Sequence, residues 1–459
     1  MKLIKWFIFF LFSISPAYLL ASDLLEVYRQ AQMNDPTIQA AREGQLATQE
    51  AIPQARAQFL PVLNASATHL AYHQSPGTNA SAPAPQTGDT HYNQSLYGLT
   101  LTQPIFYYQQ WIQLSTAAAQ VKQANATYAA AEQDLIVRTV QGYFNVLKAR
   151  DTLKFSKANR SQLSKILDQT QLKFKVGLIA ITDVQIAKAQ YDTALAEEIS
   201  NENALANQKE LLREITGQPI ETFSFVREDL TLKSPEPADL EKWVMTAVDQ
   251  NFALEAARFD AEVSRSNIKT TEAGHLPTLN INSNLNRSTS YQRTPSTTKS
   301  NVGLQVNMPL FNGGTISSKT RQAVHTYEQK QKQVETLYRK TESNTRQAYR
   351  GVLTQISQVA AQKQAIISTD SALKATEASF NVGTRTIVDV LAAQTNLVQA
   401  QQNYANARYD YIIQSVLLKQ AAGTLCPEEV QHINTWLIDK DVEINKSKST
   451  RAITSVRPS

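Results

Sequence analysis

The chain has 459 residues with 45 basic and 40 acidic side chains, and its excess of positive charge lies at the two ends. Between Ser22 and Asp439 the two signs balance at 38 each, so the composition does not predict a surface that follows nucleic-acid phosphates. The single cysteine excludes an internal disulfide bond, and the sequence contains no P-loop, nucleophile-elbow or paired-cysteine motif.

Residues 1–21 have the composition of a secretory signal peptide. Lys2 and Lys5 precede an apolar run that Pro16 ends, and Ala21 supplies a small residue for cleavage. No other stretch approaches the roughly 18 apolar residues that a membrane-spanning helix needs. We therefore expect export from the cytoplasm, and we expect short N-terminal helices over residues 22–58.

The rest of the chain contains one pattern twice. The phrase "FKVGLIAITDVQ", which begins at Phe174, returns as "FNVGTRTIVDVL" at Phe380, 206 positions later. In the same way, "GLTLTQPIF", which begins at Gly98, is similar to "GLQVNMPLF", which begins at Gly303, 205 positions later. We interpret the chain as a tandem duplication, which indicates two related halves of one object rather than an open array of repeats.

Each half begins with a predicted pair of strands, over residues 59–106 and 276–312. In "LNINSNLN" (residues 279–286) apolar residues alternate with uncharged polar ones, which predicts a face of Leu279 and Ile281 toward lipid. The opposite face, expected to meet water, carries Asn280, Asn282 and Asn284. Loops rich in Pro, Ser and Thr join the strands of each pair. A transmembrane β-barrel has these features, and half-buried hairpins of a soluble protein would look similar.

A proline-free tract follows each pair of strands and predicts a long helical hairpin, over residues 107–216 and 313–423. The first arm, residues 107–175, would be roughly 100 Å long at 1.5 Å per residue. Leu114, Val121 and Tyr128 fall seven residues apart, a spacing typical of coiled coils. From these residues alone, a soluble periplasmic coiled-coil adaptor or interaction protein remains the alternative to a channel.

Candidate catalytic groups do not form a recognisable site. Cys426 follows the last long helix, and we expect it to be a small buried residue rather than a nucleophile. His69 and His73 have the spacing of a zinc pair, but "HLAYH" lacks the glutamate of the H-E-x-x-H motif and lies on a predicted strand. We expect no enzyme activity, no metal and no cofactor.

Several long strings resemble the TolC family of outer-membrane channels of Gram-negative bacteria, and the resemblance runs from about Asp23 to Trp436. Among them are "QLKFKVGLIAITDVQIAKAQYDTALA", "NVGTRTIVDVLAAQTNLVQAQQNYANARYDYI" and "AGHLPTLNINS". The resemblance implies a mainly α protein with a membrane β-barrel. Three internally duplicated protomers would form a homotrimer with one twelve-stranded barrel in the outer membrane and one long α-helical coiled-coil barrel in the periplasm.

The same resemblance implies a function and partners. The trimer would be the exit duct of tripartite multidrug efflux pumps and of type I protein secretion, gated at its periplasmic end. It would bind a periplasmic adaptor (membrane fusion) protein and an inner-membrane transporter, with outer-membrane lipid around the barrel and no nucleic acid. Residues 217–250 would be an equatorial linker and residues 251–275 a helix of the second repeat. Residues 424–459 would be an equatorial C-terminal segment with a flexible tail.

The family resemblance also implies a gate latch near the repeated phrase. Arg385 would link to Asp183 and Thr182 on a neighbouring helix pair through charge-assisted hydrogen bonds. Phe380 stands where the family has a tyrosine, so one latch bond would be missing.

Two further roles follow from the resemblance. Asp389 would contribute to a ring of carboxylates that binds cations at the entrance, whereas a second acidic position of the family falls on Ala392. The tips that meet the adaptor would be Val176, Gly177, Leu178, Val382, Gly383 and Thr384.

Overall fold

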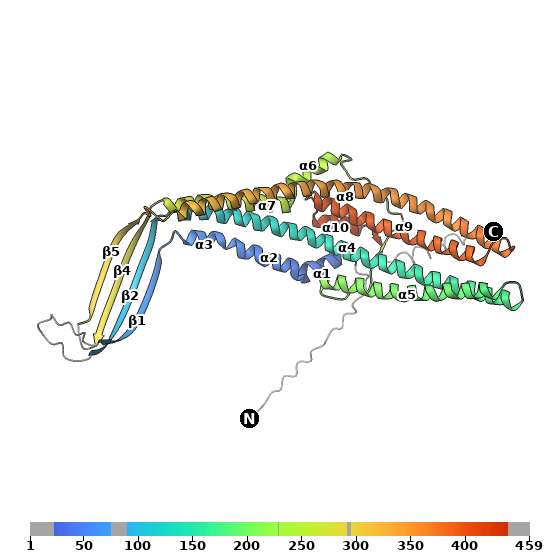
Figure 1. The fold of residues 1–459 in the computed structure, drawn as a ribbon, viewed down its shortest axis with the longest axis horizontal. Helices are drawn as coiled ribbons and strands as arrows, with labels where there is room; N and C mark the ends of the chain where they lie inside the picture. The colour runs from blue at the N-terminus through green and yellow to red at the C-terminus, as the bar shows by residue number, and fades with distance from the viewer. Residues whose placement is uncertain (1–22, 75–89, 228, 292–294, 439–459) are drawn as a thin grey trace, which may run out of the picture. The chain divides into compact units, whose positions relative to one another are not determined.

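The helices and strands form two compact units. The computed structural model describes residues 23–74, 90–227, 229–291 and 295–438. The expected signal peptide, most of the first predicted loop rich in Pro, Ser and Thr, and the whole basic tail lie outside the described residues. Residues 1–39, 132–247 and 344–459 belong to one unit, here called the tip unit, and residues 40–131 and 248–343 to the other, the strand unit. Helices α4 (Tyr108–Lys175) and α8 (Thr315–Asn381) contribute to both (Figure 1).

The strand unit contains an antiparallel sheet of four long strands in the order β1-β2-β4-β5. The strands are β1 (Val62–Gln74), β2 (Thr90–Phe106), β4 (Thr278–Tyr291) and β5 (Thr297–Asn307). The central pairing of β2 with β4 joins the two halves of the duplicated chain. Within the described chain, β1 and β5 each pair along one side, so the sheet is open and has two edges that can accept further strands.

The register of the sheet separates its two faces by polarity. Ile281 lies opposite Leu304 of β5, whereas Asn282 lies opposite Thr102 of β2 and donates from Nδ2 to Oε1 of Gln305 at 2.6 Å. Residues an even number of positions apart share a face of a strand, so most apolar side chains gather on one face, although Gln103 and Ser283 lie on it as well. The alternation predicted for residues 279–286 is therefore continued by the neighbouring strands.

Helices extend from the sheet within the strand unit. They are α3 (Ala51–Ala57), α7 (Phe252–Glu272), the short 3₁₀ helix Ala273–His275, most of α2 (Pro36–Gln49) and the first parts of α4 and α8. Asp260 of α7 ties three of them together, because it accepts from Gln123 of α4 at 3.4 Å and pairs with Lys330 of α8 at 2.8 Å. Gln45 of α2 donates to Asn125 of α4 at 3.0 Å.

The tip unit is helical and has an aromatic core. Its elements are α1 (Leu24–Asn34), α5 (Ile181–Thr216), most of α6 (Leu240–Gln250), α9 (Ile387–Ala421), α10 (Pro427–Asn434), and the two-stranded pair β3 (Phe225–Val226) and β6 (Leu437–Ile438). Tyr143 and Phe144 of α4 are fully buried; their rings lie 5.5 Å from Phe223 and 5.9 Å from Tyr409 of α9, respectively. This aromatic core joins α4 to α9 and to the segment that follows α5.

Among the described residues, no helix combines the length and the apolar composition needed to cross a membrane.

Candidate functional site

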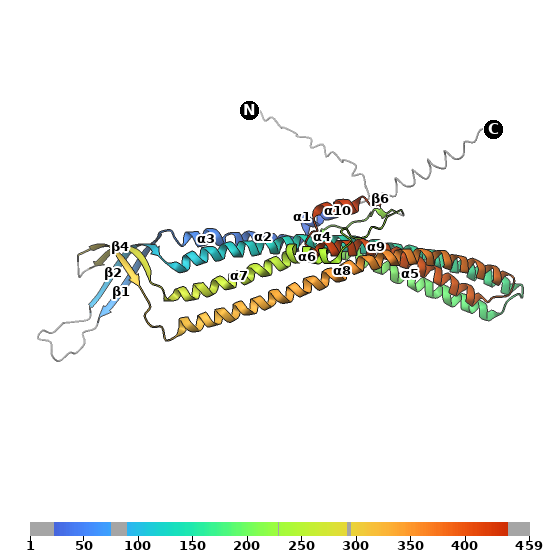
Figure 2. The same ribbon diagram turned by 90° about the horizontal axis from the view of Figure 1, so that it is seen from above.

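The candidate site is built on two turns that reverse the long helices at the same end of the tip unit (Figures 1 and 2). In the first tip turn, residues 176–180, the N–H of Gly177 donates to the Phe174 carbonyl and that of Leu178 to the Lys173 carbonyl, both at 2.9 Å. This Schellman arrangement requires a left-handed residue, and Gly177 has φ of 75°. The second tip turn, residues 382–386, repeats the arrangement, and Gly383 has φ of 82°.

The tip turns expose apolar side chains. Val176, Leu178 and Val382 are 70%, 72% and 76% exposed. A Cβ atom added at Gly177 or Gly383 would find no other atom within 4 Å, so both glycines are needed for their backbone angles rather than for close contact. Apolar side chains gathered on an exposed turn are typical of a surface that meets a partner protein.

A small hydrophobic core behind the turns fixes their position. It joins α4, α5, α8 and α9 and consists of Leu163, Ile166, Ala194, Leu373, Ile387, Val390 and Leu391. Phe380, in the last turn of α8, packs against it from the edge. This core therefore fixes the relative positions, within one chain, of the residues that are expected at the gate.

Asp389 caps its own helix. The backbone N–H and the hydroxyl of Thr386 donate to Oδ2 of Asp389 at 2.9 and 2.8 Å, and the N–H of Asp389 donates back to Oγ1 of Thr386 at 3.3 Å. These bonds of a capping box, followed by the charge of Arg385, hold the pKa of Asp389 below its usual value. Asp389 is thus a charged carboxylate with one oxygen already engaged at the start of α9.

The equivalent aspartate of the first repeat is in a different situation. Asp183 also lies in the first turn of its helix, but the cap residue of α5 is Ala180, which has no side-chain hydrogen bond to offer. Within the described chain the Asp183 carboxylate makes no hydrogen bond or ion pair. Its oxygens are therefore open to a donor from another molecule.

Arg385 does not reach the latch partners expected for it within its own chain. Its Nη1 atom lies 3.8 Å from Oδ1 of Asp389, and the guanidinium is 62% exposed. Among the described residues it makes no hydrogen bond or ion pair with Asp183 or Thr182. The expected link stays a prediction.

Lys173 was not expected at the site, and it connects the two repeats. Its Nζ atom lies 4.2 Å from the centre of the Phe380 ring and donates to Oδ1 of Asn381 at 3.3 Å. No sequence signal could have found this contact, because it joins residues 207 positions apart through the fold.

The role of Thr386 could have been read from the sequence, since "TIVD" has the spacing of a capping box.

Cys426 is exposed, so the expectation that it would be buried was wrong. It occupies the extended cap position before α10, where Pro427 begins the helix and directs the preceding residue outward. Partial desolvation and a hydrogen bond to Glu428 raise the pKa of the Cys426 thiol. A thiol kept protonated in this way is a poor nucleophile.

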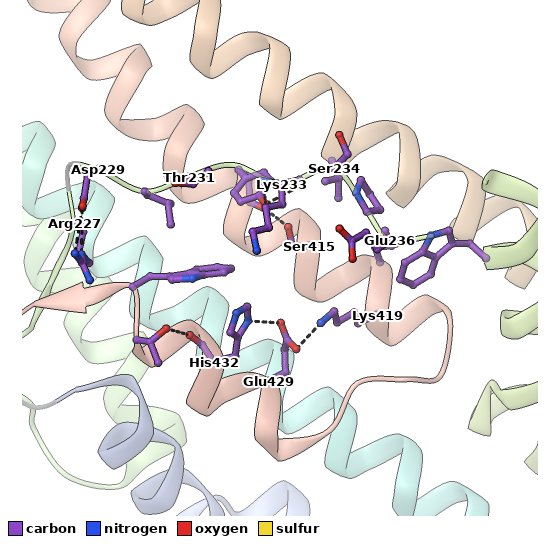
Figure 3. Close-up of a pocket in the computed structure, with 18 residues that line it drawn as sticks. Arg227, Asp229, Thr231, Lys233, Ser234, Glu236, Ser415, Lys419, Glu429 and His432 are labelled. Atoms are coloured by element: carbon purple, nitrogen blue, oxygen red, sulfur yellow. Dashed lines mark hydrogen bonds and ion pairs between the residues drawn. The ribbon is translucent and has the colours of Figure 1, made fainter. Parts of the chain in front are cut away.

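A cavity of about 620 Å³ lies elsewhere in the tip unit, between α9, α10 and the segment that leads to α6 (Figure 3). Among its charged groups, Arg227 pairs with Asp229 at 3.1 Å, and Glu429 of α10 pairs with Lys419 of α9 and lies 3.5 Å from His432. The hydroxyl of Tyr411 holds the segment against α9, because it accepts from the N–H of Lys233 at 3.0 Å and donates to the carbonyl of Lys233 at 2.9 Å. In the part of the chain that the structure describes, no group of three or more metal-ligating side chains gathers.

Comparison with known proteins gives a consistent result. The family model described as "Outer membrane efflux protein" matches residues 27–218 and 243–424, one match for each half of the duplication. "Outer membrane protein TolC" of Vibrio cholerae is 37% identical over 423 residues, covering 91% of this chain and 94% of its own. "Proteases secretion protein PrtF" of Dickeya chrysanthemi is 27% identical and covers 93% of each chain.

The fold also matches solved structures. The outer membrane channel CmeC of Campylobacter jejuni superimposes with a TM-score of 0.76 at 17% identity, over 91% of this chain and 90% of that one. At this identity the likeness concerns the fold alone.

Proposed function

The chain belongs to the outer membrane efflux protein family and is an outer-membrane channel that extends into the periplasm, and we propose that it works as a homotrimer. The predicted fold class, long helices combined with a membrane sheet, is confirmed by these relatives. The alternative, a soluble periplasmic adaptor, has no support among them. Because the relatives are channels, we infer a transport role without catalysis.

The open sheet is the observation that carries the oligomer. Each chain supplies four long strands and leaves the edges of β1 and β5 unpaired among the described residues. An open edge in a membrane would leave backbone N–H and C=O groups without partners, and the smallest closed barrels have about eight strands, so a barrel needs at least two copies. The family to which the chain belongs favours three copies, which, joined β5 to β1, would give a twelve-stranded barrel with the apolar face outside and the asparagine face inside.

The gate in this proposal forms between copies. The Asp183 carboxylate, which makes no hydrogen bond or ion pair among the described residues, would accept from Arg385 of the next copy, with Thr182 beside it. Each such exposed ion pair contributes about 0–1 kcal/mol, and a bidentate arginine lies at the upper end of that range. The competing contact of Arg385 with Asp389 is long, at 3.8 Å, so it opposes the latch only weakly.

The exposed tip turns would meet the other parts of the export machinery. Val176, Leu178 and Val382 offer apolar surface that a periplasmic adaptor's helices could cover, and an inner-membrane transporter would complete the duct. The relative named for protease secretion supports type I protein secretion beside drug efflux as the cargo route. Asp389 of each copy would form the entrance ring that binds cations.

Cell fractionation tests this function. The chain should sediment with the outer membrane, and an SDS gel of unheated sample should show a band of trimer size that heating converts to monomer. Recovery in the soluble periplasmic fraction would contradict the channel, and recovery in the outer membrane as a heat-insensitive monomer would contradict the trimer.

A further inference from the structure

Two histidines meet across the first pair of strands. In the antiparallel register of β1 and β2, His73 lies directly opposite His91. The two rings stack with centroids 4.3 Å apart and planes at 21°, and their Nδ1 atoms lie 3.1 Å apart. Both side chains are exposed. Two imidazole nitrogens therefore come together at a position that solvent can reach.

The distance between the two nitrogens suits a metal ion. Imidazole nitrogens bind Zn²⁺ at about 2.0–2.1 Å. Two bonds of that length whose ends are 3.1 Å apart enclose an angle of about 98° at the metal. This angle lies between the roughly 90° of square-planar or octahedral sites and the roughly 109° of tetrahedral ones. The stacked rings need to turn about their side-chain torsions to aim both lone pairs at one ion, a change that exposed side chains make readily.

We propose that His73 and His91 form a two-point chelate for a divalent first-row transition metal ion. The order of affinity should place Cu²⁺ above Ni²⁺ and Zn²⁺, as it does for nitrogen ligands generally. Among the described residues, no group of three or more metal-ligating side chains gathers, so the proposed site takes two protein ligands from these strands. The site goes beyond the proposed export function, and the chelate does not depend on it.

His69 provides a natural control on the same strand. It shares the sheet face of His73 but lies four residues away, roughly 13 Å along the strand. It faces Ser95 across the strands, and its Nδ1 atom lies 3.0 Å from the serine hydroxyl. The pair His69 and His73, considered from the sequence, is therefore too widely spaced to chelate one ion, and His91 takes the place of His69.

The position of the pair places it at the water-exposed edge of the membrane. His91 lies on the same face as Leu101 but ten residues nearer the start of β2, roughly 33 Å along the strand. Strands of a membrane barrel are tilted by about 35–45°, so this separation is about 25 Å along the membrane normal, which equals the height of the apolar band. With Leu101 inside the band, the chelate would stand at or beyond its edge, at the end of the sheet away from the helices (Figure 1).

Isothermal titration of the detergent-solubilised full-length protein with CuCl₂ tests the proposal. The protein is purified without a polyhistidine tag, and the Cys426→Ala background removes the exposed thiol. We expect His73→Ala and His91→Ala each to weaken Cu²⁺ binding at least about tenfold, because even second-shell contacts are worth about 10- to 100-fold in metal affinity. His69→Ala should bind like the parent.

Electron paramagnetic resonance of bound Cu²⁺ provides a second readout. The parent and His69→Ala should show two nitrogen ligands, and each of the other variants should show one fewer. Circular dichroism of the same samples verifies that the variants are folded. Equal isotherms for all four proteins, or an equal loss in His69→Ala, would overturn the proposal.

Discussion

The Nζ atom of Lys173 lies 4.2 Å from the centre of the Phe380 ring, which ties the first helical hairpin to the second just behind their tip turns. The two tip turns of one chain are thereby held as a pair, together with the hydrophobic core beneath them. Opening of the proposed gate would then separate neighbouring copies rather than the two hairpins of one copy.

The first prediction concerns the latch. Arg385→Ser should raise the conductance of the idle channel, because it removes three symmetric links from the trimer. If each exposed link contributes about 0.5 kcal/mol, the three together contribute roughly 1.5 kcal/mol and shift the open-to-closed ratio about tenfold. Single-channel recording in planar bilayers measures this change. Lys374→Ser is the matched control, since it removes a cation of α8 that is also mostly exposed and pairs with Asp370. Unaltered conductance in Arg385→Ser would rule out the latch.

The second prediction concerns the aromatic ring of Phe380, which Lys173 contacts. Phe380→Leu should loosen the pairing of the hairpins by about 0.5–1 kcal/mol, because it removes an exposed cation–π contact. Phe380→Tyr keeps that contact and adds a hydroxyl that can donate to Asp183 of a neighbouring copy, so it should lower the idle conductance. The same bilayer recordings compare the two variants. An equal effect of Tyr and Leu would show that the hydroxyl makes no latch bond.

The third prediction separates the two roles of Asp389. Asp389→Asn removes the charge of the entrance ring and should abolish block by divalent cations, while the amide still accepts from Thr386. Thr386→Ala keeps the carboxylate and should retain block, although losing the cap costs about 1 kcal/mol of helix stability. Because the pKa of Asp389 is lowered, block should persist as the pH falls into the range where an ordinary carboxyl protonates. Current–voltage curves with added divalent cation measure both variants, and equal loss of block would contradict the assignment.

The fourth prediction concerns the faces of the sheet. In a Cys426→Ala background, Asn282→Cys should react with a membrane-impermeant thiol reagent and Ile281→Cys should not, because the two side chains lie on opposite faces. Labelling of membrane-embedded protein, read by mass spectrometry, gives the two yields. Equal labelling would show that the asparagine face does not line a water-filled channel.

The duplication, the long helices and the alternating strands could be predicted because each depends on local periodicity. The helix that was expected to begin at Tyr107 begins at Tyr108, and the two tip glycines occupy the left-handed turns that their residue type favours. The capping box of Thr386 and Asp389 also has a local sequence signature, "TIVD". The family resemblance indicates only the second role of Asp389, in the cation ring.

Contacts between distant residues could not be predicted from the sequence. The position of Lys173 beside Phe380 depends on how two hairpins pack, and the meeting of His73 with His91 depends on the register of strands joined by a long connection. The proposed pairing of Arg385 with Asp183 depends on how separate copies of the chain assemble, which the sequence of one chain does not specify. Cys426 was misjudged because its residue type is usually buried, whereas here the start of α10 directs it outward.

Native mass spectrometry of the detergent-solubilised protein tests the central claim, that open four-stranded sheets from several chains close into one channel. The account predicts a single assembly of three copies, because three sheets give the twelve-stranded barrel that the family resemblance implies, with every strand edge paired. A monomer, or a stable dimer with no trimer, would contradict it.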